Sequence, residues 1–277
     1  MSWKTIGMVL PGKLSEARLS LHWAAQLVSA PGTSLLPARA DYSHTNLGWD
    51  QELAVLTGRN VGEQSLQAAL VFEGLELAVI ADGRERSSMG LAGHTLPQAL
   101  GWLGREIAGD EAALALPVHE MPSHPLGQGG VFSDAGPEER AELSAWFANA
   151  FALIQKAVAH EAAASPVRCW PHHFDVASLI TLDQGAGAEE ARSIGVGFSP
   201  GDGSYDQPYF YITPWPYPGA EDPLPPLPAG VQWHRSGWTG AVLTAEHLIS
   251  VPPEERALTA WQAVERGLAA CRELLHA

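Results

Sequence analysis

The stretch that decides the fold lies in the second half of the chain: Cys169–Leu182 has the sequence C-W-P-H-H-F-D-V-A-S-L-I-T-L, and Ser193–Trp215 has S-I-G-V-G-F-S-P-G-D-G-S-Y-D-Q-P-Y-F-Y-I-T-P-W. Short runs of apolar and aromatic residues are separated here by Gly, Pro and Asp, a pattern typical of strands joined by turns. We therefore predict strands at 173–182, 194–198 and 209–212, with a tight turn at 199–203.

Amphipathic helices are expected on both sides of this stretch. The clearest begins at Pro137 and extends to Ala163, because aromatic and aliphatic residues recur there at helical spacing. Pro31-Gly32 is expected to end the first helix. The other predicted helices are 14–29, 97–107 and 253–275.

Further strands are predicted at 52–57 and within 231–244, and Glu73-Gly74 is expected to join 67–72 and 75–81 into a hairpin. Adjacent strands joined so closely pair antiparallel. The sequence thus predicts an α+β fold, with mainly antiparallel sheets packed against several amphipathic helices. The 277 residues form either a single domain or two halves, 1–115 and 137–277, joined by the Pro- and Gly-rich loop 116–136. Seven prolines from Pro214 to Pro228 predict an extended segment without a sheet ladder.

The composition limits the classes of partner. Sixteen Lys and Arg residues stand against 31 Asp and Glu residues, a formal net charge of -15. This acidic balance argues against nucleic acid and against an anionic membrane surface as partners. Two distant cysteines give no disulfide framework, so we expect an acidic, soluble protein of bacterial type in a reducing cytoplasm. The sequence does not define the oligomeric state.

The candidate ligand site combines residues from several segments. If residues 173–182 form a strand, His173 and Asp175 share one of its faces. Asp202 follows in the Ser-Pro-Gly-Asp turn, and the ligand-site prediction also includes these four side chains: Tyr209, Tyr211, His22 and His44. The two tyrosines either stack on a ligand or close a core.

A divalent metal is an alternative occupant. His173 and Asp175 would be two ligands, and the third would come from Asp202, His22, His44 or His234. The chain has no H-E-x-x-H motif and no paired C-x-x-C motif. His173 and Asp175 could instead fix a turn through hydrogen bonds.

Two other features leave alternatives open. Arg18, His22 and Gln26 lie four residues apart along one helix face, which is either a solvent-facing stripe or one wall of a pocket. Gly195 and Gly197 share one strand face, where a ligand or another piece of backbone could approach closely.

The motifs W-P-H-H-F-D at 170–175, S-P-G-D at 199–202 and P-Y-F-Y-I-T-P-W at 208–215 resemble the pattern W-P-x-H-F-D, S-P-G-D, P-Y-x-Y-x-x-P-W of an uncharacterised family of bacterial proteins. The resemblance implies a shared fold and a shared site but brings no established activity. His172 stands where we associate Glu with the pattern. We predict a protein that binds a small ligand; the alternatives are a metal-dependent hydrolase and a purely structural motif.

Overall fold

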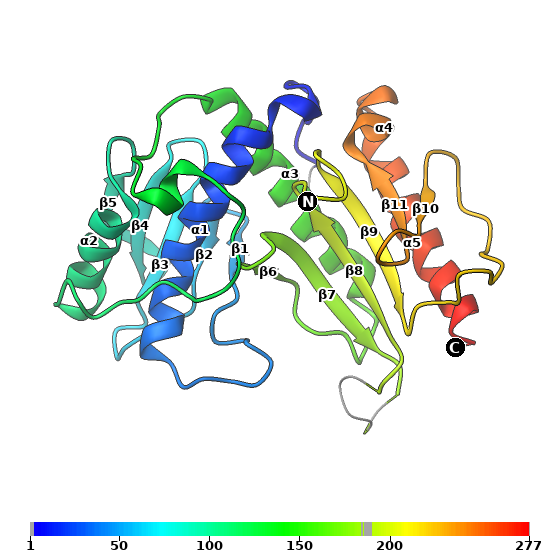
Figure 1. Ribbon diagram of the computed structural model, residues 1–277, viewed down its shortest axis with the longest axis horizontal. Helices are drawn as coiled ribbons and strands as arrows, with labels where there is room; N and C mark the ends of the chain where they lie inside the picture. The colour runs from blue at the N-terminus through cyan, green and yellow to red at the C-terminus, as the bar shows by residue number, and fades with distance from the viewer. Residues whose placement is uncertain (1–2, 184, 186–189, 277) are drawn as a thin grey trace. The chain divides into compact units, whose positions relative to one another are not determined.

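The computed structural model describes residues 3–183, 185 and 190–276 (Figure 1). Helices and antiparallel sheets confirm the predicted α+β class. Contacts divide the chain into two compact units. The β1–β5 unit consists of Lys13–Ala148 and Arg168–Phe174, and the β7–β11 unit consists of the remaining described residues. This division differs from the expected halves, because the loop 116–136 lies inside the β1–β5 unit.

The β1–β5 unit contains a sheet whose strands follow one another in chain order, each paired antiparallel with the next. The predicted hairpin is confirmed as β3 and β4. Of the strand expected at 52–57, only 55–57 is a strand (β2), because residues 51–54 form the turn that joins it to β1, which was not predicted. The bounds are Gly48–Asp50 (β1), Val55–Thr57 (β2), Gln67–Val71 (β3), Glu76–Ala81 (β4) and Arg84–Gly90 (β5).

Strand β5 was not predicted. Asp82 and Gly83, with φ of 50° and 72°, form the tight turn that leads from β4 into β5. Strand β5 has the sequence R-E-R-S-S-M-G, which is charged and mostly exposed because β5 lies at an edge of the sheet. Charges on an edge strand prevent pairing with other chains, and they also hide the hydrophobic alternation from a sequence reading.

Helix α1 spans Ser15–Leu35, so the prediction that Pro31-Gly32 ends it is wrong. Proline within a helix removes a hydrogen bond and costs about 3 kcal/mol. Burial outweighs this cost: Pro31 and Gly32 are both buried, and a Cβ on Gly32 would lie 2.2 Å from the carbonyl oxygen of His44. The helix continues because its last turns pack against the chain around His44.

Helix α2, Leu96–Ala108, begins and ends as the sequence predicts. Thr95 and Gln98 form a capping box, in which each side chain accepts the backbone N–H of the other. Gly109, with φ of 73°, provides the left-handed residue that ends the helix. Helix α1 packs against β2 and β3, and α2 packs against β4.

Helix α3 spans Pro137–Val158, and the boundary between the units falls within it. Its predicted apolar face is confirmed up to its last residue, Val158, which is only half-buried. The other members are at most 1% exposed: Leu143, Trp146, Phe147, Ala150, Phe151 and Ile154. The helix ends before the predicted Ala163 because residues 163–165 pair with strand β7. Thr181 N donates to Ala163 O, and Ser165 N donates to Leu179 O at 2.8 Å.

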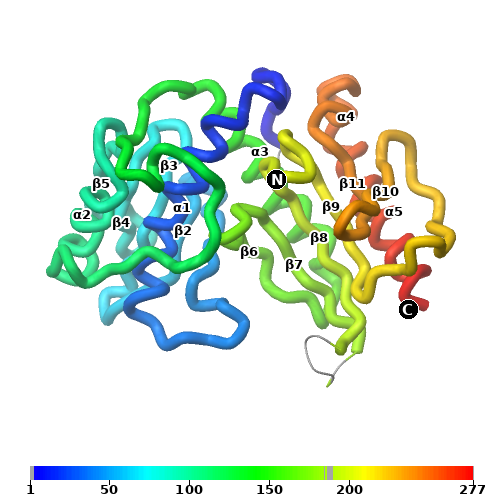
Figure 2. The backbone as a smooth tube through the Cα atoms, in the orientation of Figure 1, coloured from blue at the N-terminus to red at the C-terminus, as the bar shows by residue number. Residues whose placement is uncertain are grey.

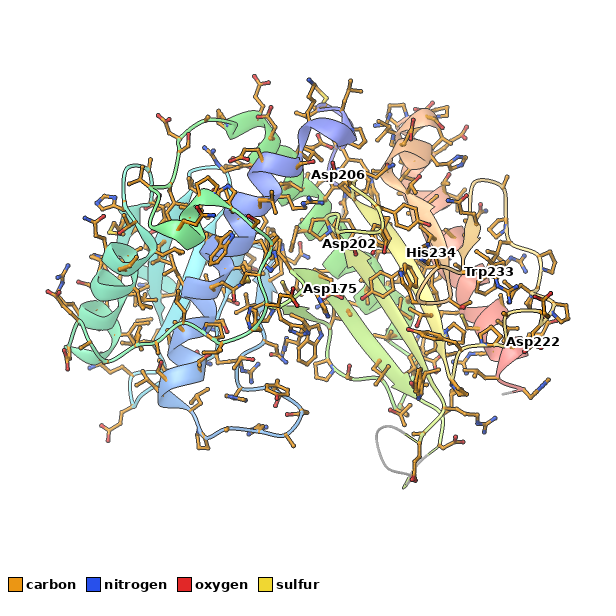
Figure 3. The ribbon with its side chains drawn as sticks, in the orientation of Figure 1. Asp175, Asp202, Asp206, Asp222, Trp233 and His234 are labelled. Carbon is orange, nitrogen blue, oxygen red and sulfur yellow. The ribbon has the colours of Figure 1, made fainter. Side chains whose placement is uncertain are left out.

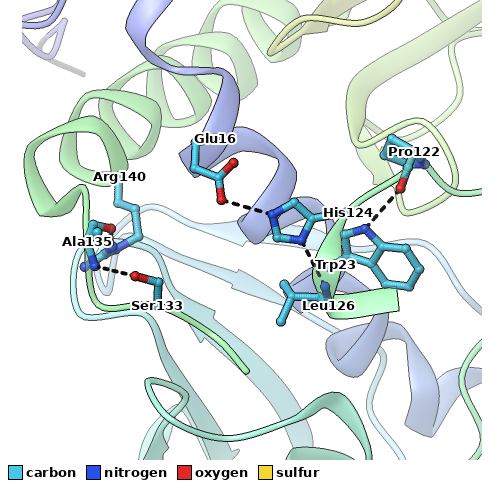
Figure 4. Close-up of polar contacts among 8 residues, drawn as sticks. All are labelled: Glu16, Trp23, Pro122, His124, Leu126, Ser133, Ala135 and Arg140. Carbon is cyan, nitrogen blue, oxygen red and sulfur yellow. Dashed lines mark hydrogen bonds and ion pairs between the residues drawn. The ribbon is translucent and has the colours of Figure 1, made fainter. Parts of the chain in front are cut away.

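The loop 116–136 is fixed to α1, as Figure 4 shows. His124 Nδ1 accepts from Leu126 N, so its Nε2 carries the proton and donates to Glu16 at 3.0 Å. Trp23 Nε1 donates to Pro122 O at 3.2 Å. The loop contains one short 3-10 helix, η2, Pro125–Gln128.

The β7–β11 unit contains strands in the order β10-β11-β9-β8-β7, paired antiparallel. The expected strands at 173–182, 194–198 and 209–212 appear with shifted ends, and the expected strand content of 231–244 is confirmed. The bounds are Asp175–Thr181 (β7), Ser193–Ser199 (β8), Tyr209–Trp215 (β9), Gln232–His234 (β10) and Gly240–Thr244 (β11). The short strand β6, Arg168–Trp170, belongs to the other unit, where Cys169 exchanges backbone hydrogen bonds with Leu47.

One face of the β7–β11 sheet is an apolar core covered by helix α5, Arg256–Leu274, which packs against β8, β9 and β11 (Figure 1). The approach of helix and sheet is close: a Cβ on Gly267 would lie 2.8 Å from Cδ1 of Ile212. Helix α4, Ala245–Ser250, precedes α5 and is capped by Thr244. The face consists of these buried residues: Val176, Ile180, Ile194, Val196, Phe198, Phe210, Ile212, Ala241 and Leu243.

The proline-rich segment 216–231 forms a long arc between β9 and β10 (Figure 2). As predicted, it contains no strand, although Pro214 itself lies within β9. Trp233 Nε1 donates to Pro225 O at 2.8 Å, and Arg235 donates to Gly219 O at 2.6 Å. Side chains rather than a ladder therefore hold the arc.

Among the described residues, none of the helices combines the length and the apolar character that crossing a bilayer requires.

Arg140, 5% exposed, donates to the carbonyls of Phe72, Glu73, Asp134 and Ala135. Replacing it in Arg140→Met leaves these acceptors without their donor, so we expect the free energy of unfolding to fall by about 3 kcal/mol in denaturant titration. The exposed pair Arg105 and Glu111 provides the control, and Arg105→Met should change stability by less than about 0.5 kcal/mol. Equal losses in both variants would contradict this role of Arg140.

Candidate functional site

The seven residues of the predicted ligand site fall into two groups. Asp175, Asp202, Tyr209 and Tyr211 belong to the β7–β11 unit, and the three histidines His22, His44 and His173 belong to the β1–β5 unit. Each group is assembled by its own unit.

The polar face of the β7–β11 sheet lies opposite the core covered by α5, and Figure 3 labels Asp175 and Asp202 there. Strand β7 begins at Asp175, and His173 lies in the preceding turn, so the two residues do not share one face of a single strand as the sequence predicted. The register instead aligns Ala177 with Gly197 and Gly197 with Tyr211. Asp175, two residues before Ala177, shares this face.

Gly197 makes room for Tyr211. A Cβ on Gly197 would lie 2.1 Å from Cζ of the Tyr211 ring, so the ring lies directly over the glycine. The sequence suggested that a ligand or another piece of backbone lies above Gly197. An aromatic side chain from the neighbouring strand lies there. Gly195, on the same face, has nothing nearer than 3.7 Å.

Each tyrosine of strand β9 donates a hydrogen bond to a carboxylate. Tyr211 OH donates to Asp175 Oδ2 and Tyr209 OH to Asp202 Oδ2, both at 2.5 Å, and the two rings lie 6.0 Å apart. Desolvation, followed by the hydrogen bond with Asp202, raises the pKa of Tyr209 far above its usual range. Desolvation and the charge of Asp175 raise the pKa of Tyr211 likewise. Both phenols therefore stay protonated as donors.

The Ser-Pro-Gly-Asp turn positions Asp202. Its Oδ1 accepts from Ser204 N at 2.7 Å and from Tyr205 N at 3.2 Å, while its own N–H donates to Tyr205 O. This Asx-type geometry leaves Asp202 exposed, with Oδ2 directed at Tyr209. The predicted turn at 199–203 thus holds the Asp202 carboxylate beside Tyr209 of strand β9.

Three aromatic residues that the ligand-site prediction omitted complete this surface. Trp238 lies 6.4 Å from Tyr209 and 6.2 Å from Tyr211 between ring centroids, and His234 stacks on Trp238 at 4.2 Å. Tyr205 lies 4.9 Å from Tyr209 and hydrogen-bonds His234 Nδ1 at 3.1 Å. Trp238 and His234 belong to the β10–β11 hairpin, which lies beside β9 because β11 pairs with β9. Without knowledge of that pairing, the sequence could not have placed them at this surface. We call Asp175, Asp202, Tyr209, Tyr211 and Trp238 the acidic aromatic face.

In the β1–β5 unit, Trp170–Phe174 forms a tight turn in which Phe174 N donates to Trp170 O at 2.7 Å. Phe174 has φ of 59° and is fully buried, 4.9 Å from Phe147 between ring centroids. A positive φ costs a residue with a side chain about 1–2 kcal/mol, and burial of the phenyl ring offsets it. This part of the motif therefore has a structural role.

Helix α1 holds that turn through His22 and Gln26. His22 Nε2 and Gln26 Nε2 lie 2.9 and 2.8 Å from the carbonyl oxygen of Pro171, and the His22 ring stacks on Phe174. Both side chains are buried, so for them a solvent-facing stripe is the wrong interpretation. Burial lowers the pKa of His22 to about 4, although the hydrogen bond to Pro171 acts in the opposite direction.

Two further histidines lie in that turn, and His119 and His44 lie near it. His172 and His173 have ring centroids 4.2 Å apart, and His119 lies 6.1 Å from His172. His44 Nδ1 accepts from Arg39 N at 3.2 Å. Within residues 3–183, 185 and 190–276, no three His, Cys, Asp or Glu side chains are arranged to hold a metal ion. The metal site built on His173 and Asp175 stays a sequence-based prediction.

Comparison with known proteins adds no relative: no protein-family model matches the chain, and no curated protein or solved structure is similar to it.

Gly197 and Gly195 offer a matched pair of substitutions on one strand. Gly197→Ala forces the Tyr211 ring away from Asp175, so we expect a loss of about 1–3 kcal/mol in the free energy of unfolding. Gly195→Ala meets only ordinary contacts and should cost less than about 0.5 kcal/mol. Denaturant titration of both variants measures the difference, and similar losses would show that Tyr211 does not depend on Gly197.

The lowered pKa of His22 predicts acid-sensitive stability. Between pH 6.5 and about 4 the unfolded chain binds a proton at His22 that the folded chain does not, so stability falls as the pH decreases through this range. His22 contributes at most roughly 3 kcal/mol to the fall. His22→Gln should flatten the dependence of unfolding free energy on pH, whereas His160→Gln, at an exposed position, should not. Identical pH profiles for all three proteins would refute the assignment.

Proposed function

We propose that this protein binds a small organic cation at the acidic aromatic face of the β7–β11 unit. The observation that carries the proposal is the placement of two carboxylates beside three aromatic rings on one sheet face, each carboxylate bonded at 2.5 Å to a tyrosine hydroxyl. These polar groups cost little because each tyrosine hydroxyl is paired with a carboxylate, and together they make a polar, aromatic surface.

The chemistry of the face favours a positive charge. Aromatic rings attract an ammonium or guanidinium group through their π faces, and a carboxylate adds a charge-assisted hydrogen bond. Tyr211 and Trp238 are half-buried and lie at 74° to each other, so these two rings are the ones that can contact a cation, whereas Tyr209 is buried and acts through its hydrogen bond to Asp202. The net charge of -15 also attracts cations.

Asp202 is the most accessible acid of the face. It is exposed, and among the described residues of its unit no Lys or Arg forms an ion pair with it. Its Oδ2 accepts from Tyr209 and retains a second lone pair that can accept from a ligand N–H. Tyr209 and the turn hold the carboxylate in place, which reduces the ordering cost of binding.

A structural role for the same motif is the second candidate, and a specific observation favours it. Both oxygens of Asp202 already accept hydrogen bonds from the protein, and Asp175 and Tyr211 link β7 to β9 across Gly197. If the motif has only this structural role, substitution of Asp202 lowers the stability of the protein and no cation binds.

We also propose the reducing cytoplasm as the location. Cys169 and Cys271 are both buried thiols, and burial raises the pKa of Cys271 to about 12. Neither forms a disulfide in the described part of the chain, as expected in a reducing compartment. A disulfide joining them in protein isolated from cells would contradict this location.

Titration calorimetry with putrescine tests the cation proposal, with butanediol as the uncharged probe of similar length. We expect putrescine to bind and butanediol not to bind. Asp202→Asn should weaken putrescine binding about tenfold, equivalent to ~1.4 kcal/mol.

The control is Asp222→Asn, which also removes one negative charge but lies in the proline-rich arc, away from the face in Figure 3. It should leave the affinity unchanged. If both variants weakened putrescine binding equally, the loss would come from the change in net charge and not from Asp202 itself. Absence of putrescine binding, together with a loss of stability in Asp202→Asn, would establish the structural role.

A further inference from the structure

Gly48 of strand β1 leaves an open place on the face of the β1–β5 sheet that helix α1 does not cover. A Cβ on Gly58 would lie 2.5 Å from the carbonyl oxygen of Val28 in α1, so Gly58 and Leu56, at alternate positions, face the helix. Thr57 lies between them and faces the other way, and the pairing of β1 with β2 sets Gly48 directly opposite Thr57. The bare backbone of Gly48 is therefore on the face away from α1, where it is only half-buried.

Two hydrogen-bond donors converge on the place above Gly48. A Cβ on Gly48 would lie 3.1 Å from Oγ1 of Thr57 and 3.9 Å from Nη1 of Arg168. Arg168 reaches this place from strand β6, because the pairing of Cys169 with Leu47 sets Arg168 opposite Gly48. Thr57 and Arg168 are half-buried as well, so all the residues around this place keep accessible surface.

A second guanidinium group lies near that of Arg168. Arg59 follows Thr57 by two residues, and after desolvation its charge is the next cause that lowers the pKa of Arg168. Among the described residues, the Arg59 guanidinium takes part in no ion pair and donates no hydrogen bond. Two like charges at such a place repel each other, and a bound anion would remove the repulsion.

The carboxylate of the same strand face does not supply that anion. Asp50, two residues from Gly48, accepts two hydrogen bonds at 2.9 Å from backbone N–H groups of the turn at 51–54. It therefore caps its own turn, and the charge that acts on Arg168 is that of Arg59.

We infer that Gly48, Thr57, Arg59 and Arg168 form a binding site for a small phosphate dianion, either free phosphate or a phosphate monoester. We call it the Gly48 site. A phosphate dianion neutralises both guanidinium charges at once, whereas a carboxylate neutralises one. A guanidinium has five N–H donors, so Arg168 can bind the anion in addition to its contacts within the protein, and the Thr57 hydroxyl can donate to another phosphate oxygen.

The ligand is small because the net charge of -15 repels an extended polyanion. The Gly48 site belongs to the β1–β5 unit and the acidic aromatic face to the β7–β11 unit, so this inference does not depend on the cation proposed there.

Titration calorimetry with methyl phosphate and with inorganic phosphate tests the inference, and acetate is the monoanionic probe. We expect at least one of the two phosphates to bind about tenfold or more tightly than acetate. Binding of both assigns the site to monoesters, and binding of inorganic phosphate alone assigns it to free phosphate.

Arg59→Met removes the charge but keeps the aliphatic stem, whose Cγ would lie 3.5 Å from a Cβ on Gly32. The affinity for phosphate should fall about tenfold. Arg84→Met is the matched control, because Arg84 is exposed in β5 of the same unit and the change in net charge is the same. It should leave the affinity within about twofold.

Gly48→Ala places a methyl group where the anion would bind, so phosphate binding should again fall about tenfold or more. In Gly90→Ala, also on a strand of this sheet, the added methyl group meets nothing within 4 Å, and binding should be unchanged. Thermal unfolding of each variant verifies that it folds.

Three results would each overturn the inference: no phosphate binding above that of acetate, equal losses in Arg59→Met and Arg84→Met, or unchanged binding in Gly48→Ala. Asp202→Asn should bind phosphate as the natural protein does. Failure of the cation proposal and failure of this one are therefore separate results.

Discussion

The β7–β11 unit depends on the packing of the Tyr211 ring over Gly197. Any larger residue at position 197 would occupy the space of the ring, and Tyr211 would then lose its position beside Asp175. Because Gly197 of β8 has no side chain, the Tyr211 ring can lie over it, and the Tyr211 hydroxyl then reaches the carboxylate of Asp175 on β7. Tyr209 and Asp202 repeat the arrangement two residues earlier in β9, where the carboxylate comes from a turn and not from a strand.

In the β1–β5 unit, polar side chains form hydrogen bonds with buried backbone carbonyls that lie outside helices and sheets. His22 and Gln26 lie within hydrogen-bonding distance of Pro171 O, and Arg140 donates to carbonyls of four residues. An unpaired carbonyl at such places would cost as much as a lost hydrogen bond. These polar residues of helices α1 and α3 are therefore part of the core, although their side chains are of types that sequence patterns assign to the surface.

Sequence patterns predicted most of the fold because its local signals are strong. Pro137, Pro97 and the β3–β4 hairpin mark element ends through backbone chemistry that any fold shares. Patterns failed where tertiary packing decides: α1 passes through Pro31, β5 lacks alternation, and α3 ends where residues 163–165 pair with β7. The site was predicted in part. Asp175, Asp202, Tyr209 and Tyr211 belong to one surface, whereas His22 faces a carbonyl and Trp238 joins the surface only through strand pairing.

The path of the chain through its two units has a consequence for its synthesis. The β1–β5 unit requires residues up to Phe174, because the turn that fills its core comes last. The β7–β11 unit requires residues far apart in the sequence, since Lys4 exchanges hydrogen bonds with Asn149 and the side chain of Arg256 donates to Ile6 O. Neither unit is a continuous segment that a ribosome could release and let fold before the next begins. Native contacts of long sequence separation must form after most of the chain has emerged, which makes folding slow relative to a chain of successive domains.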